Sequence, residues 1–133
     1  MKKKIALLVA MAGAAVLFAG CSSLQTAGVK EFNGQDITTS GTGVAHVSGY
    51  ASGFYLLSIP LFVGSTEAPD TIAWNEDSCN VTAVTKMVTA KSKALNASRT
   101  VDLVSSSDSF NVPFPFPFLF YWRTVTVSGN AVR

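Results

Sequence analysis

VAHVSGY at residues 44–50 and FYLLSIPLFV at residues 54–63 decide the fold that we expect for this chain. In the first stretch, valine, histidine and tyrosine are spaced among small residues, a pattern typical of a β-strand. The second is almost wholly apolar and is typical of a strand buried on both faces. Pro60 cannot donate to a ladder, so we expect an edge or a break there. Gly49 and Gly53 indicate a bulge, a turn or a close backbone approach.

One segment carries helical spacing, and we predict the main helix over residues 80–96. Its apolar side chains would share one face of a helix: Val81, Val84, Val88 and Leu95. Ser78 or Asp77 could cap its start, where acidic residues suit the helix dipole. The frequent valine and threonine residues favour a strand instead, and this alternative stays open at the level of the sequence.

The remaining segments predict further strands. Residues 64–77 carry four acids and are expected to form a surface loop with a short strand at 71–74. Residues 99–105 and 124–132 alternate apolar and polar side chains, as half-buried strands do. The fold class that we expect is therefore α+β, a small antiparallel or mixed sheet with one main helix. It would form a single globular domain over residues 43–133.

Aromatic and proline residues alternate over residues 110–122. Seven large apolar side chains occupy even positions: Phe110, Val112, Phe114, Phe116, Phe118, Phe120 and Trp122. In a strand they would share one face, while the intervening prolines would leave one edge without donors. One straight strand would span about 43 Å, which is long for a small domain. We therefore expect a bend at the Pro-Phe repeat that gives two strands or a projecting hairpin.

Two interpretations of this aromatic segment remain. In the first, most of its phenylalanines belong to the core and cover the helix. In the second, Phe114 and Phe116 are exposed at a loop tip and contact lipid or a partner protein, as exposed apolar clusters commonly do.

The first 21 residues read as a secretory signal. Three lysines precede an apolar or small-residue run of fifteen residues, 5–19, and Gly20-Cys21 closes it. The run falls short of the roughly 20 residues that a membrane-spanning helix needs. The order of these features resembles the signal of bacterial lipoproteins, whose lipobox places small residues before a cysteine.

That resemblance implies cleavage between Gly20 and Cys21, with Cys21 lipidated as the first mature residue. Residues 1–20 would be the signal peptide, and residues 21–42, rich in Ser, Thr, Gly and Gln, a lipidated N-terminus and flexible tether. Ser22, in place of the aspartate that commonly signals retention at the inner membrane, favours the outer membrane, facing the periplasm. The alternative for Cys21 is an unmodified thiol in a secreted protein.

Charge and cysteine content narrow the function classes. The ten basic residues fall to seven without Lys2, Lys3 and Lys4, against eight acids, for a net charge of −1. The basic footprint of a nucleic-acid-binding protein is therefore not expected. Cys79 would be the second cysteine of the mature chain, and we interpret it as a buried small hydrophobe. A redox or nucleophilic thiol is its alternative.

No catalytic motif is found. Serine-hydrolase elbows, dinucleotide loops and phosphate-binding loops need glycine patterns that the chain does not contain. One histidine and one cysteine besides Cys21 are too few for a typical zinc site. We therefore expect no metal, no cofactor and no enzymatic activity. The alternative is a small periplasmic ligand-binding or enzymatic domain that uses His46, Cys79 or the acidic loop.

Short glycine and valine patterns in the mature region resemble known small lipoproteins. VSGYASG at 47–53, LLSIPL at 56–61 and VTVSGNAV at 125–132 are similar to the TRL-like family. The last pattern also resembles the closing strand of YbjQ-like domains. The resemblance implies only a small strand-rich domain with a helix, and no catalytic residues can be carried over from it. The expected function is a lipid-anchored cell-envelope lipoprotein, held at the membrane, that binds an envelope protein partner or contributes to envelope structure.

Overall fold

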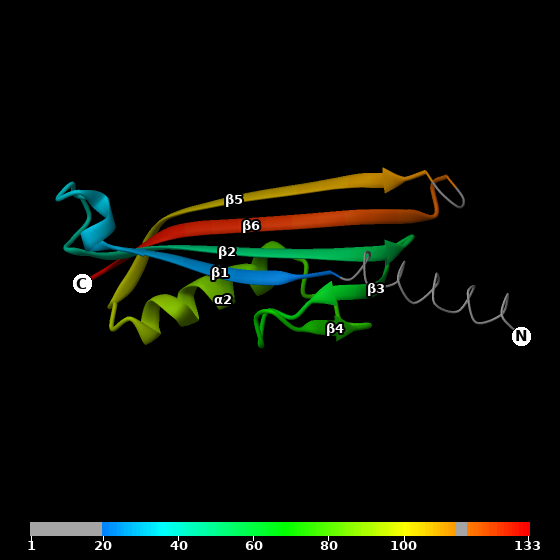
Figure 1. Ribbon diagram of the computed structural model, residues 1–133, viewed down its shortest axis with the longest axis horizontal. Helices are drawn as coiled ribbons and strands as arrows, with labels where there is room; N and C mark the ends of the chain where they lie inside the picture. The colour runs from blue at the N-terminus through cyan, green and yellow to red at the C-terminus, as the bar shows by residue number, and fades with distance from the viewer. Residues whose placement is uncertain (1–19, 114–116) are drawn as a thin grey trace, which may run out of the picture.

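The structure is a computed structural model that describes residues 20–113 and 117–133. A six-stranded sheet carries one α-helix on one of its faces (Figure 1). In chain order the elements are β1 (Ser22–Gly28), the 3-10 helix η1 (Val29–Phe32), β2 (Gly43–Leu56), β3 (Ile59–Gly64), β4 (Ile72–Trp74), α2 (Val81–Ala94), β5 (Arg99–Val112) and β6 (Phe120–Val132). The prediction of an α+β fold with one main helix is confirmed.

Strand β2 is the centre of the sheet, whose order is β4-β3-β2-β6-β5. Every pairing is antiparallel. One edge of β2 pairs with β6 along its whole length. The other edge is shared, because β1 pairs with residues 45–51 and β3 with residues 53–56. The start of β1 therefore meets the end of β3 on the same edge of β2.

The core lies between α2 and one face of β2 and β6. Its buried side chains come from alternate strand positions and from one helix face: Val47, Ala51, Tyr55, Val63, Cys79, Val84, Met87, Val88, Val125, Val127 and Ala131. At Gly49 a Cβ would lie 2.7 Å from Cγ2 of Val88 and 2.9 Å from Cε of Met87. Glycine therefore lets the helix approach β2 closely, which is one of the roles that its position predicted.

The helix begins one residue later than predicted and has a different cap. Asn80 has an extended backbone, and its side chain accepts from the backbone N–H of Ala83 at 2.8 Å. Asp77 and Ser78, the caps expected from the sequence, precede that position. Asp77 instead accepts from the hydroxyl of Tyr55, and Ser78 is buried.

The prediction of a flexible tether over residues 21–42 is wrong for residues 22–28, which form β1. The physical reason is the edge of β2: residues 45–51 need partners for their backbone groups, and β1 supplies them. Ser22 is also buried, and Leu24 packs against the core. The polar composition of residues 22–28 does not indicate a strand, so the sequence did not predict β1.

The apolar stretch at 54–63 forms two strands rather than one. The chain turns after Leu56, with Leu57 in the left-handed region at φ 56°. Its backbone N–H donates to the carbonyl of Leu119 at 2.7 Å. Pro60 lies within β3, opposite Tyr55, where the register between β2 and β3 shifts. The break that Pro60 predicted therefore occurs just before it.

The aromatic segment bends as predicted. Strand β5 ends at Val112 and β6 begins at Phe120, and the two strands pair antiparallel up to these residues at one end of the molecule (Figure 1). Phe114 and Phe116 lie outside the described residues. Phe110 and Phe118 are 60% and 73% exposed, so the interpretation of these rings as core is wrong for these two.

Candidate functional site

Cys21 lies where β1 meets β3 on the edge of β2, and Ser52 holds its backbone. The amide of Cys21 donates to Oγ of Ser52 at 3.1 Å. Its carbonyl accepts from the backbone N–H of Ser52 at 2.7 Å and from Oγ of Ser52 at 3.2 Å. Cys21 is thus fixed to the sheet directly before β1 begins.

The backbone of Gly20, Cys21 and Ser22 packs tightly against the end of β3 and against Ser52, and we call this contact the seam. At Gly64, the last residue of β3, a Cβ would lie 2.1 Å from the carbonyl carbon of Cys21. At Gly20 a Cβ would lie 2.4 Å from the carbonyl oxygen of Ser52. Only glycine at these positions lets the start of β1 fit against the end of β3. Ser22 then closes the seam, because its buried hydroxyl donates to the carbonyl of Ser65.

The side chain of Cys21 is accessible although its backbone is fixed. The residue is exposed and its thiol is free, with Sγ 3.5 Å from Oγ of Ser52. A group bonded to this sulfur would leave the protein directly from the edge of the sheet. A tether does not intervene, since β1 begins at the next residue.

Cys79 lies in a different environment. It is fully buried, and its thiol donates to the carbonyls of Ala51 and Arg123 at 3.4 Å each. Burial raises the pKa of the Cys79 thiol to about 11, although the charge of Arg123 acts in the opposite direction. The neutral thiol therefore dominates at physiological pH, which is unsuited to a nucleophile.

Tyr55 forms a polar cluster with two neighbours of Cys79, in which Tyr55 itself is buried, Arg123 is half-buried and Asp77 is exposed. Its hydroxyl donates to Oδ1 of Asp77 at 2.6 Å, and the guanidinium of Arg123 lies 4.8 Å from its ring centroid. Burial and the hydrogen bond to Asp77 raise the pKa of Tyr55. Sequence spacing does not reveal this cluster, because the three residues come from β2, the loop before α2 and β6.

His46 belongs to a network at the opposite end of the sheet. Its Nδ1 lies 2.8 Å from Oδ1 of Asn130, whose amide donates to Asp102 at 3.1 Å and to the carbonyl of Ile37 at 2.9 Å. The structure therefore brings His46 and Asp102 into one network, but the amide of Asn130 stands between them. A relay from imidazole to carboxylate is not formed by this arrangement.

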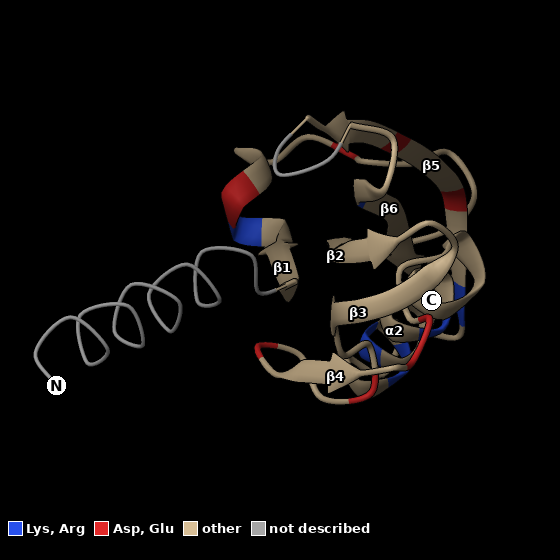
Figure 2. Cartoon of the chain, turned by 90° about the vertical axis from the view of Figure 1, so that its right-hand side faces the viewer, with Lys and Arg blue, Asp and Glu red and all other residues tan. Residues whose placement is uncertain are grey.

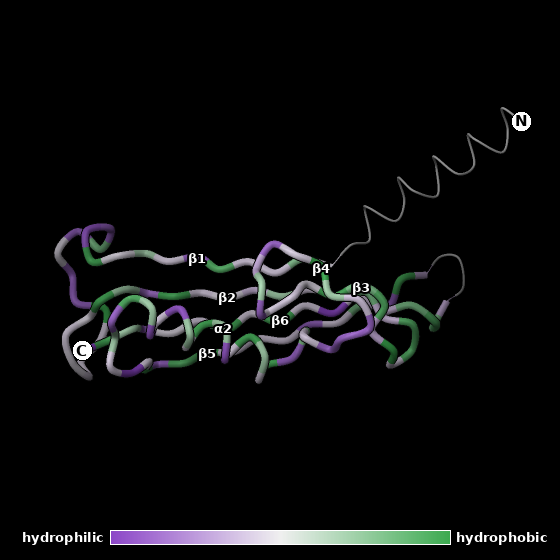
Figure 3. Tube along the Cα trace, turned by 90° about the horizontal axis from the view of Figure 1, so that it is seen from below, coloured by the Kyte–Doolittle hydropathy of each residue, from purple (hydrophilic) through white to green (hydrophobic). Residues whose placement is uncertain are grey.

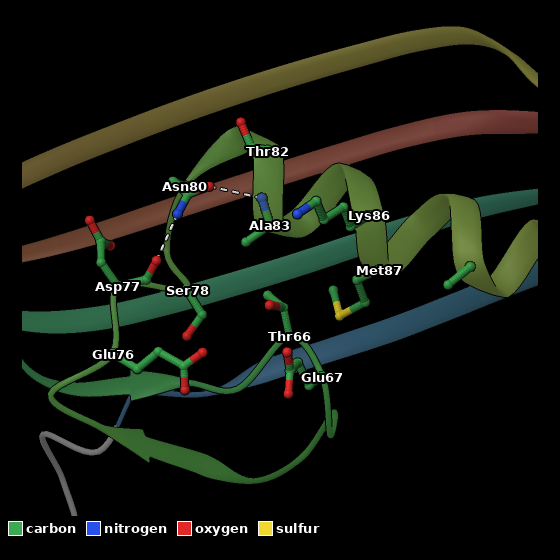
Figure 4. Close-up of a pocket in the computed structure, with 11 residues that line it drawn as sticks. Thr66, Glu67, Glu76, Asp77, Ser78, Asn80, Thr82, Ala83, Lys86 and Met87 are labelled. Atoms are coloured by element: carbon green, nitrogen blue, oxygen red, sulfur yellow. Dashed lines mark hydrogen bonds between the residues drawn. The ribbon is translucent and has the colours of Figure 1, made fainter.

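The acidic loop borders an open groove of about 480 Å³ beside the first turns of α2. Figure 4 shows Glu76 and Ser78 directed toward this space, with Glu67 facing them from the loop between β3 and β4. The hydroxyl oxygen of Ser78 is buried without a hydrogen-bond partner. These carboxylates give the groove an acidic lining, and Lys86 from α2 adds one positive charge.

The described residues lack the groupings expected of a metal centre or a membrane-spanning helix. Within residues 20–113 and 117–133, His, Cys, Asp and Glu form no group of three or more that could hold a metal ion. In the same ranges, no helix has the length and hydropathy needed to cross a membrane. No protein-family model, curated protein or solved structure matches this chain. The resemblance to lipoprotein signals and to TRL-like and YbjQ-like domains therefore stays a prediction.

Proposed function

We propose that this protein is a lipid-anchored lipoprotein of the bacterial cell envelope, cleaved between Gly20 and Cys21 and acylated on Cys21. The observation that carries the proposal is the placement of Cys21. The residue is exposed and its thiol is free, while its backbone is bound to Ser52 one residue before β1 begins. The hydrogen bond from its amide to Ser52 is compatible with N-acylation, because an acylated amine keeps one N–H.

The strength of such an anchor follows from its chains. Each buried CH₂ contributes about 0.8 kcal/mol, and stable attachment takes more than one chain. Lipoproteins with this type of signal carry several chains on one cysteine, which would hold the domain firmly. We assign it to the outer membrane, facing the periplasm, from Ser22. The fold supplies a second reason for serine there, since an aspartate would bury a charge beside the carbonyl of Ser65.

We propose a structural or partner-binding role rather than an enzymatic one. Two side chains of the mature chain are the best candidates for catalysis, and both have surroundings typical of structural residues. Cys79 is buried and its thiol has a raised pKa, and the imidazole of His46 is hydrogen-bonded to Asn130. The acidic groove beside Ser78 is the feature that supports the alternative, a small ligand-binding domain.

Replacement of Cys21 tests the anchor. The full chain is produced in a bacterial host that is fed an alkyne-labelled fatty acid, and the label on the purified protein is measured. We expect label on the wild type, no label on Cys21→Ala, and full label on the matched variant Cys79→Ala, because only the exposed thiol at the end of the signal is acylated. An unlabelled wild type, or label that persists in Cys21→Ala, would contradict the proposal.

A further inference from the structure

An unbroken row of aromatic side chains crosses the sheet from one edge to the other. Each of its members lies directly opposite the next in the strand register: Trp74 on β4, Phe62 on β3, Phe54 on β2, Trp122 on β6 and Phe110 on β5. Directly opposite residues of an antiparallel pair point to the same face. The row therefore presents five rings on one face of the sheet.

That face is the one opposite to α2. Tyr55 and Val63 are buried in the core under the helix. Side chains alternate along a strand, so the adjacent Phe54 and Phe62 point away from the helix. Within the row, the rings of Phe62 and Trp74 meet edge to face at 4.7 Å. Trp74 and Phe110, at the two edges, are 69% and 60% exposed.

The next row toward the hairpin end continues the apolar surface. Leu56, Phe120 and Val112 lie opposite one another on the same face, and the ring of Phe120 stacks on Phe54 at 5.3 Å. We call the five rings together with Phe120 the aromatic band. Figure 3 shows hydrophobic segments around β3 at this end of the molecule, in addition to those along α2 and β2.

On the two central strands, the remaining positions of the same face are polar. Behind the band, β2 presents Ser52, Tyr50 and Ser48, and β6 presents the hydroxyl side chains opposite them, Thr124, Thr126 and Ser128. Strands β2, β3 and β4 contain no charged residue, and Figure 2 shows them without red or blue apart from the adjoining loops. On β2 and β6 the face is thus divided into an apolar end and a hydroxyl-rich remainder.

Cys21 lies at this boundary and on this face. Its sulfur is 3.5 Å from Oγ of Ser52, and Ser52 precedes Phe54 by two residues, so their side chains point the same way. Two residues along a strand span roughly 7 Å. A lipid on Cys21 would therefore leave the protein roughly 7 Å from Phe54, the central ring of the aromatic band.

We infer that the aromatic band rests in the interface of the bilayer that holds the acyl chains of Cys21. This inference rests on the proposed function. Aromatic rings, tryptophan above all, favour the boundary between hydrocarbon and head groups. Because β1 starts directly after Cys21, the anchor keeps the band at a high effective concentration relative to the membrane. That placement favours the bilayer as occupant over a second copy of the chain.

The tryptophans supply the test without any substitution. The chain has two, Trp74 and Trp122, and both belong to the band. The acylated full-length protein is incorporated into vesicles of phosphatidylethanolamine and phosphatidylglycerol with bromine on the acyl chains. We expect tryptophan emission to fall at least two-fold relative to the same vesicles without bromine, because bromine quenches only at contact range.

Two variants refine this measurement. Phe110→Ser removes an exposed ring from the edge of the band, and we expect it to reduce the quenching. Val104→Ser is the matched control: Val104 is 65% exposed, lies opposite Ser128 on the same face, and is about 20 Å from Phe110 along β5. We expect it to leave the quenching unchanged. Circular dichroism confirms the fold of each variant.

The outcomes separate this inference from the proposed function. Protein that carries acyl groups by mass and floats with the vesicles, yet shows unquenched tryptophans open to iodide, overturns the inference and leaves the anchor in place. Crosslinking of two copies through the band with unquenched tryptophans also overturns it and assigns the face to a dimer. Protein without acyl groups overturns the proposed function itself.

Discussion

At the scale of single residues, Ser52 binds Cys21, the proposed site of acylation, to the sheet. It is fully buried, and its backbone and hydroxyl bind both backbone groups of Cys21. The sequence predicts Cys21 from its place after the apolar run, because a signal is a local pattern. It does not predict Ser52, since a pairing across 31 residues leaves no local pattern in the sequence.

Cys79 gives a pH prediction. Its pKa is about 11 in the folded protein against an ordinary value of 9.0, so the folded state binds the proton more tightly than the unfolded chain. The contribution of the neutral Cys79 thiol to the free energy of unfolding is therefore fully present below pH 9 and is lost as the pH rises toward 11. The raised pKa of Tyr55 acts in the same direction.

Urea unfolding of the full chain at pH 8 and at pH 10.5 measures this effect. We expect a lower free energy of unfolding at pH 10.5, and a smaller loss between the two pH values in Cys79→Ala, which keeps Tyr55 but removes the thiol. Equal losses in the wild type and in Cys79→Ala would show that the thiol does not contribute.

At the scale of elements, the contact between α2 and β2 depends on the missing side chain of Gly49. We expect Gly49→Val to lower the free energy of unfolding by about 1–3 kcal/mol, because its methyl groups would overlap Val88 and Met87. Ser48→Val, which points to the other face, should change it by less than about 1 kcal/mol. Urea unfolding compares the two variants. A Gly49→Val protein as stable as the wild type would contradict the close approach.

The elements also show where sequence reasoning succeeds. The helix at 81–94 and the hairpin around 113–119 are predicted well, because apolar spacing and the Pro-Phe repeat are local signals. Strand β1 is missed, because its Ser, Gln and Thr residues suggest a tether and its stability comes from the edge of β2. The turn at Leu57 is likewise hidden inside an apolar run, with a leucine in a left-handed conformation.

The aromatic band is only partly visible in the sequence. The even spacing from Phe110 to Trp122 predicts that its rings share a face. The sequence does not predict that Phe54, Phe62 and Trp74 extend this row across three more strands, because strand order and register come from the folded sheet. Phe114 and Phe116, expected as contacts, lie outside the described residues.

At the scale of the whole molecule, one sheet has two different faces. The helix and the core occupy the first, and the second is divided between hydroxyl groups and the aromatic band, with Cys21 at their boundary. A lipid at that point would orient the domain, since the band and the acyl chains would reach the same bilayer from the same side. The proposed contact of the aromatic band with the membrane therefore depends on acylation of Cys21.

Mass spectrometry of the N-terminal peptide, isolated from the native envelope protein, tests that dependence most directly. The account predicts a peptide that begins at Cys21 and carries the added mass of fatty acyl groups. A peptide that begins at Cys21 with an unmodified thiol, or one that still begins at Met1, would contradict it.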